Sequence, residues 1–255
     1  MQDINSKKLS PSKEIAYIAV MSALLIGGQF VFSFVTGVEI VTLLLVCFSY
    51  SFGMRRGAVC AIAFSILRCL LFGFYPTAII LYLVYYPILA ILFGALGHVK
   101  DKTFENYPVV FAVIINILLL GIACASAACY GLDLIKVSRI YKVTVYALLW
   151  VVFALCIALL VAFDGLFIAK KVFKKGSVNA LKLITVASLG AVCTICFTLL
   201  DDIITPLFWG YNPSTSLAYF YTSFTAMLPQ TVCTILSIVT LFLPITALFG
   251  KIIKA

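Results

Sequence analysis

Long apolar runs repeat along the whole chain and restrict what it can fold into. Most are about 18 to 25 residues long, the length of helix that crosses a hydrocarbon core of roughly 30 Å. Hydrophobic residues make up 64% of the chain and charged residues only 11%, whereas a soluble domain is nearer half apolar and a quarter charged. The sequence therefore predicts an integral membrane protein.

Two alternatives explain these runs less well. The first run, from Ile15 to about Val35, follows three lysines as a secretory signal would, but it is too long and no small-residue cleavage site follows it. A membrane β-barrel needs segments of about ten residues that alternate between apolar and polar positions, and these runs are continuously apolar. We therefore expect an all-α, polytopic bundle of transmembrane helices.

The chain divides into eight apolar segments within a single membrane domain, residues 1–255. The segments lie at roughly 14–35, 38–53, 57–73, 76–98, 107–130, 143–169, 180–200 and 229–250. A further stretch from Leu217 to Met227 is apolar but brief, and it ends at Pro229. We expect this stretch to be a loop or half helix on the outer side.

The basic residues are unevenly distributed between the two sides of this layout. With a cytoplasmic N-terminus, 14 of the 18 lysines and arginines fall on the cytoplasmic side, three fall outside, and Arg68 lies within a helix. The 14 are Lys7, Lys8, Lys13, Arg55, Arg56, Lys100, Lys102, Lys170, Lys171, Lys174, Lys175, Lys182, Lys251 and Lys254. Cytoplasmic loops carry such an excess, so both termini are expected in the cytoplasm. The bias also explains the net charge of +9 without a nucleic-acid partner.

The sequence lacks the common catalytic and metal-binding motifs. It has no Walker A sequence and no H-E-x-x-H, and its only histidine, His98, is expected at headgroup level. Cys193 and Cys196 form a C-x-x-C inside an apolar run with no second pair, so we interpret them as packing residues. We expect no enzyme, no metal site and no cofactor.

Four ionisable residues lie at or near membrane depth, where charge is costly and usually functional. They are Glu39, Arg68, Asp201 and Asp202. The topology places all four in the outer half of the protein, which predicts one shared substrate pocket open to the exterior. The alternatives are that the carboxylates face water at the interface, and that Arg68 snorkels or pairs with an aspartate as a structural bridge.

An aromatic stretch follows the two aspartates. Trp209 and Tyr211 belong to it, and we expect their rings to form a lid over the substrate, although an aromatic belt at the lipid interface is the alternative. Three carboxylates against one arginine favour a cationic or hydrogen-bond-donating substrate, and the aromatic rings favour a flat heteroaromatic one.

Small residues recur on the first helix at Ala16, Ala19 and Ala23. Small residues four positions apart allow another helix to approach closely. On these features together, the chain resembles the substrate-binding S components of energy-coupling factor transporters, which import vitamins and other micronutrients in bacteria and archaea.

The resemblance covers residues 14–99 and about 180–250. It rests on the order of several short motifs: Ala19-x-x-x-Ala23, Gly37-Val38-Glu39-Ile40, Phe52-Gly53-Met54-Arg55-Arg56-Gly57, Leu71-Phe72-Gly73-Phe74-Tyr75-Pro76, Phe93-Gly94-Ala95-Leu96-Gly97, Leu228-Pro229-Gln230 and Leu241-Phe242-Leu243-Pro244. Family members typically have six helices, so the segments at 107–169 look like an inserted pair.

The resemblance implies a mechanism and a set of partners. An S component of the prokaryotic plasma membrane binds its substrate from outside, and outer loops close over it. It then docks on a transmembrane T subunit, here through Ala19 and Ala23, and topples to present the site inward. Two separate cytoplasmic ATPase subunits power the cycle.

Two other functions compete with this interpretation. A standalone secondary transporter of a small polar or aromatic solute would use Asp201 and Asp202 for ion coupling, and a paired inverted repeat would favour it. A membrane-embedded enzyme would need a nucleophile, a metal set or a catalytic base that the sequence does not display.

Overall fold

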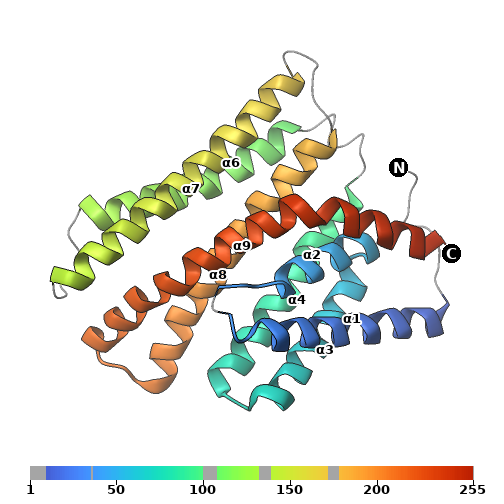
Figure 1. Cartoon of the computed structure of the whole chain (residues 1–255), viewed down its shortest axis with the longest axis horizontal. Helices are drawn as coiled ribbons and strands as arrows, with labels where there is room; N and C mark the ends of the chain where they lie inside the picture. Colours follow the sequence, from blue (N-terminus) through green and yellow to red (C-terminus); the bar gives the residue numbers. More distant parts are fainter. Residues whose placement is uncertain (1–9, 36, 100–107, 132–138, 172–177, 255) are drawn as a thin grey trace.

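The computed structural model describes residues 10–35, 37–99, 108–131, 139–171 and 178–254. Within these ranges the chain forms eight α-helices and no strand. The helices are α1 (Pro11–Phe32), α2 (Val41–Phe52), α3 (Met54–Phe72), α4 (Pro76–His98), α6 (Pro108–Gly131), α7 (Arg139–Lys171), α8 (Val178–Trp209) and α9 (Pro213–Lys254) (Figure 1). The predicted all-α bundle of about eight helices is confirmed.

Five of these helices are long and apolar enough to cross a membrane, namely α1, α4, α7, α8 and α9. Helix α2 and the middle of α6 are apolar but shorter. The three longest, α7, α8 and α9, have 33, 32 and 42 residues, well above the roughly 20 that a bilayer requires. The chain is a multi-pass membrane protein.

The last two helices differ from the sequence-based prediction. The stretch from Leu217 to Met227 is no separate loop or half helix, because α9 runs without a break from Pro213 past Pro229. Proline is tolerated inside membrane helices where neighbouring groups satisfy the freed backbone. Here the first part of α9 packs along α8, and Tyr219 and Ser223 donate hydrogen bonds to carboxylates of α8, which holds this part helical.

Helix α2 lies at the centre of one hydrophobic cluster. Nine of its 12 residues are buried, and it packs against α1, α3, α4 and α9. Gly53 alone joins α2 to α3 with a φ of 91°, which favours glycine. Gly94 and Gly97 let α4 approach this turn closely, since a Cβ on Gly94 would lie 2.6 Å from the Cα of Met54. Gly53, Gly94 and Gly97 thus allow α4 to pack beside α2.

The remaining helix pair lies on the other flank of the molecule. Figure 1 shows α6 and α7 side by side, with α8 and α9 between them and α1 to α4. This pair packs against α8 and α9 and has its own apolar cluster with them, centred on residues such as Leu119, Leu149 and Phe163. That α6 and α7 were inserted into a six-helix core stays a prediction.

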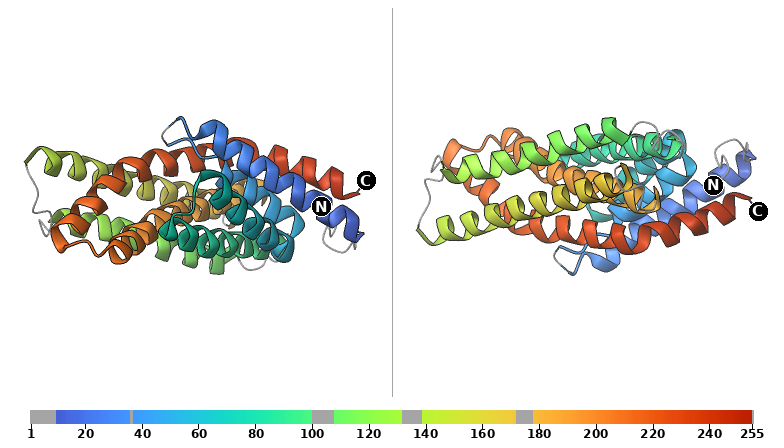
Figure 2. Two further views of the ribbon diagram at one scale, coloured as in Figure 1. Left: turned by 90° about the horizontal axis from the view of Figure 1, so that it is seen from below. Right: turned by 90° about the horizontal axis from the view of Figure 1, so that it is seen from above.

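The start of α1 and the end of α9 lie at the same end of the molecule (Figure 2). Which side of the membrane this end faces stays a prediction. Some of the basic residues that support it lie outside the described residues: Lys7, Lys8, Lys100, Lys102, Lys174 and Lys175. Lys182 was counted as a cytoplasmic charge, but its side chain is only 7% exposed.

Candidate functional site

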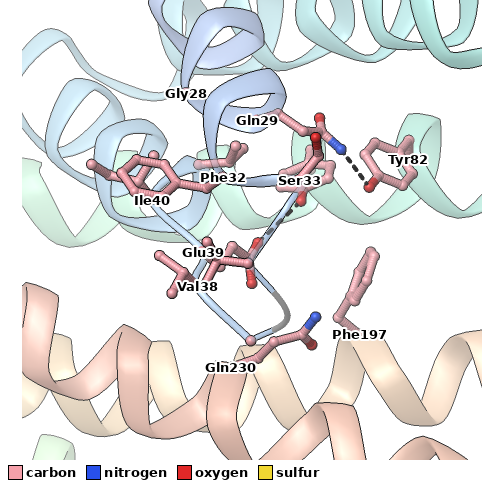
Figure 3. Close-up of a pocket in the computed structure, with 14 residues that line it drawn as sticks. Gly28, Gln29, Phe32, Ser33, Val38, Glu39, Ile40, Tyr82, Phe197 and Gln230 are labelled. Carbon is pink, nitrogen blue, oxygen red and sulfur yellow. Dashed lines mark hydrogen bonds between the residues drawn. The ribbon is translucent and has the colours of Figure 1, made fainter.

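A cavity of about 270 Å³ lies at the opposite end of α1 from its start. It is lined by the end of α1, by residues 33, 35 and 37–40 of the connection that follows, by the first residue of α2, and by helices α4, α8 and α9. The side chains of Gln29, Glu39, Phe197 and Gln230 converge on it (Figure 3). With cytoplasmic termini, the cavity belongs to the outer half of the protein.

The connection between α1 and α2 forms one wall of the cavity, and glycine shapes it. Gly37 has a φ of 87°, a conformation that favours glycine. It lies directly against Pro229 of α9, where an added Cβ would clash with the proline ring. Because Gly37 touches α9, the connection folds back over the bundle and carries Glu39 inward.

Glu39 is held by two hydroxyl groups. Thr42 Oγ1 donates to Glu39 Oε1 at 2.7 Å, and the Tyr86 hydroxyl donates to the same oxygen at 3.3 Å. Among the described residues, no donor bonds Oε2. Glu39 lies in the connection outside the spanning helices, where burial raises its pKa while the bonds from Thr42 and Tyr86 oppose this rise. The residue therefore offers the cavity one free carboxylate oxygen.

Three aromatic rings form another wall. Tyr82 and Tyr86 lie one turn apart on α4 with their ring centroids 5.0 Å apart. Phe197 of α8 lies 5.9 Å from the ring of Tyr82 and 6.0 Å from that of Tyr86. Such spacings are typical of interacting aromatic pairs, so the three rings form one packed surface facing the cavity.

Two glutamines add neutral polar groups. Gln29 Nε2 donates to the Tyr82 hydroxyl at 3.1 Å, while Gln29 Oε1 is buried without a hydrogen-bond partner. Gln230 lines the cavity from α9. A buried amide oxygen without a donor costs free energy of about 1–3 kcal/mol, which a ligand N–H group would recover.

Arg68 lies beside this site without lining it. Its guanidinium carbon is 4.3 Å from the ring centroid of Tyr82 and 5.8 Å from that of Phe72. Its Nε and Nη1 atoms have no hydrogen-bond partner, and within the described part of the chain Arg68 forms no ion pair with an aspartate. The structure therefore brings Arg68 near Glu39 through Tyr82, but forms no bridge with an aspartate.

Asp201 and Asp202 form a second polar cluster, between α8 and α9. Asp201 accepts hydrogen bonds from Thr205 at 2.7 Å and from the Tyr219 hydroxyl at 2.8 Å. Asp202 accepts one from Ser223 at 2.7 Å, and its Oδ1 has no partner. Neither aspartate lines the cavity around Glu39. The expectation of one pocket shared by all four charged residues is thus not met.

The aromatic residues predicted as a lid lie away from the cavity. Trp209 is 56% exposed and packs against Phe208, with ring centroids 5.4 Å apart. Tyr211 lies 6.2 Å from Tyr219, on the side of the aspartate cluster. Neither lines the cavity. The segment that lines the cavity instead is the connection between α1 and α2, which carries Glu39.

Sequence reasoning assigned no role to several lining residues that carried a signal. Gln29 is an amide inside the first apolar run, and Gln230 is one in the last. Tyr82 and Tyr86 share a helix face because they are four residues apart. Phe197 carries no such signal, because a phenylalanine in an apolar run is ordinary. Its place on the aromatic wall follows from the packing of α8 against α4.

The groups that line the cavity can donate and accept hydrogen bonds and contact an apolar ring. Within the described residues, no group of three or more histidine, cysteine, aspartate or glutamate side chains is placed to hold a metal ion. The cavity instead combines one carboxylate, two amides and an aromatic wall. In comparisons with known proteins, no family model matches the chain, and no curated protein or solved structure matches it.

Proposed function

We propose that the chain is the substrate-binding subunit of a micronutrient importer of the energy-coupling factor type. The observation that carries the proposal is the cavity under the connection between α1 and α2, with Glu39 inside it. A concave site with a few convergent polar groups is the usual form of a small-molecule site. The substrate enters from outside, and the connection between α1 and α2, with Gly37 and Glu39, closes over it.

The exposed face of α1 supports the expected docking on a T subunit. Ala19 and Ala23 are both exposed, and the nearby Gly27 has open space around the position of a Cβ. Such a small-residue surface allows a second helix to approach closely. In the proposed assembly this face contacts the T subunit in the cell membrane of a prokaryote, and two cytoplasmic ATPase subunits supply the energy.

Native mass spectrometry of gently purified protein tests whether the cavity holds a solute. Val38→Trp places a large ring in the cavity wall, whereas Val31→Trp changes an exposed valine of α1 that does not line the cavity. We expect a small co-purifying molecule with the wild type and with Val31→Trp, and its loss with Val38→Trp. A molecule retained equally by both variants would contradict a solute site in this cavity.

A standalone secondary transporter is the second candidate. The observation that favours it is the Asp201–Asp202 cluster, in which Asp202 is 9% exposed and Oδ1 lacks a partner, since buried carboxylates of this kind serve proton or ion coupling in transporters. Uptake into proteoliposomes distinguishes the two. A secondary transporter accumulates solute alone under an ion gradient, whereas a binding subunit requires the T and ATPase subunits.

A further inference from the structure

The hydrogen-bonding groups that remain free in the cavity include two acceptors. Both bonds to Glu39 fall on Oε1, which leaves Oε2 without a donor among the described residues. Gln29 uses its amide nitrogen on Tyr82, which leaves its buried oxygen without a donor. A ligand that satisfies both oxygens must bring hydrogen atoms on nitrogen or oxygen to them.

The aromatic wall favours positive charge in the same ligand. The faces of aromatic rings attract cations when these lie within about 6 Å of a ring centroid. Three rings, those of Tyr82, Tyr86 and Phe197, pack together at centroid distances of 5.0 to 6.0 Å. The carboxylate of Glu39 lies on the neighbouring wall (Figure 3).

Arg68 does not reverse this preference. Its guanidinium group lies against the ring of Tyr82 at 4.3 Å, and Arg68 is not a lining residue. A cation in contact with Glu39 would be roughly 3 Å from the carboxylate, whereas the guanidinium group belongs to a residue outside the cavity lining. Because Coulomb energy falls with distance, attraction by Glu39 outweighs repulsion by Arg68.

On the basis of the proposed function, we infer that the substrate is a small organic cation. Its nitrogen carries N–H groups that bond Glu39 Oε2 and Gln29 Oε1, and its charged end lies against the wall of Tyr82, Tyr86 and Phe197. The cavity of about 270 Å³ lies just below the range of about 300 to 1,000 Å³ typical of sites for drug-sized ligands. The substrate class is therefore a protonated amine, amidine or heteroaromatic base with about one ring.

Three probes of nearly the same shape test the charge preference directly. Benzamidinium, benzamide and benzoate share one ring and differ in charge from +1 through 0 to −1. We expect the purified wild type to bind benzamidinium at least about tenfold more tightly than benzamide in calorimetric titrations, and to bind benzoate more weakly still. Glu39→Gln should abolish this preference, with benzamidinium falling to the affinity of benzamide.

The matched control is Glu14→Gln. Glu14 is also a carboxylate near one end of α1, but it pairs with Arg56 and does not line the cavity, so its loss should leave all three affinities unchanged. Equal or tighter binding of benzamide or benzoate by the wild type would overturn the inference, as would no binding of any probe. An undiminished preference in Glu39→Gln would overturn it too.

The Val38→Trp variant separates this inference from the proposed function. If benzamide or benzoate binds best and Val38→Trp abolishes that binding, the cavity is a solute site for another chemical class, and only the inference falls. If Val38→Trp changes neither the binding of the probes nor the co-purifying molecule, the cavity is no solute site, and both fall.

Discussion

At the residue scale, Glu39 is the polar group around which the site is organised. It was predicted from its position at membrane depth, and the structure places it in a cavity. Its neighbours were not predictable to the same degree, because the partners of a charge depend on which helices meet. Asp201 and Asp202 have the same sequence signal as Glu39, yet each accepts a hydrogen bond from α9 instead of lining the cavity.

Glu39→Gln should make the stability of the ligand-free protein less dependent on pH. Burial raises the pKa of Glu39 in the folded state above its ordinary value of 4.5, so the folded state holds the proton more tightly than the unfolded state. The free energy of unfolding then falls as pH rises above about 4.5, by about 1.4 kcal/mol for each unit by which the pKa is raised.

The measurement is the melting temperature of both proteins in detergent from roughly pH 5 to pH 8. The wild type should lose stability relative to Glu39→Gln as pH rises, because the glutamine has no proton to release. Glu14→Gln, which removes a carboxylate outside the cavity, should follow the wild type. Parallel curves for the wild type and Glu39→Gln would show that the Glu39 carboxylate is not destabilised by burial.

Arg68→Ala should lower stability even without ligand. The guanidinium group lies 4.3 Å from the ring of Tyr82, and such a cation–π contact contributes about 0.5 to 2 kcal/mol. Arg55→Ala is the control on the same helix, since Arg55 is exposed and surface substitutions usually change stability by less than about 0.5 kcal/mol. Unfolding curves of both variants decide whether Arg68 is a structural partner of Tyr82 or a ligand contact. Unchanged stability with lost ligand affinity would make Arg68 a ligand contact.

At the element scale, the existence of the helices was predictable and their ends were not. Eight apolar runs became eight helices because the length of an apolar run is set by the bilayer. The pattern of hydrophobicity weakens at Asp201 and at Pro229, and both positions were read as ends. Helices α8 and α9 continue through them, because the hydrogen bonds between the two helices stabilise segments that their own composition does not.

The face of α1 that carries Ala19 and Ala23 is the element on which coupling should depend. Ala19→Trp or Ala23→Trp should reduce energy-dependent uptake to near background when the T and ATPase subunits are present, since an indole ring blocks the close approach of two helices. Ligand affinity of the isolated subunit should stay near that of the wild type, because neither alanine lines the cavity.

The control is Ile62→Trp on α3, which enlarges another exposed apolar side chain and should leave uptake intact. Uptake that survives both alanine substitutions would show that the docking surface lies elsewhere. The flank formed by α6 and α7 (Figure 1) would then be the next surface to test, because it also carries exposed apolar side chains such as Ile117 and Val161.

At the scale of the whole molecule, α8 and α9 join two differently packed halves. One apolar cluster unites α1 to α4 with parts of α8 and α9, and the other unites α6 and α7 with other parts of the same two helices. The cavity belongs to the first half, and the aspartate cluster lies where the last part of α8 meets the first part of α9. The sequence of a single segment does not reveal that α8 and α9 contribute to both apolar clusters, because this depends on the length of the two helices and on how they cross.

The orientation of this molecule determines from which side the cavity fills. The start of α1 and the end of α9 lie at one end of the molecule (Figure 2), and 14 basic residues against three favour the cytoplasm for that end. A reporter that is active only in the cytoplasm should therefore be active when fused after Lys254 and inactive when inserted at Asn212, in the turn between α8 and α9. The reverse pattern would place the cavity around Glu39 on the cytoplasmic side, and the protein would then bind its solute from within the cell.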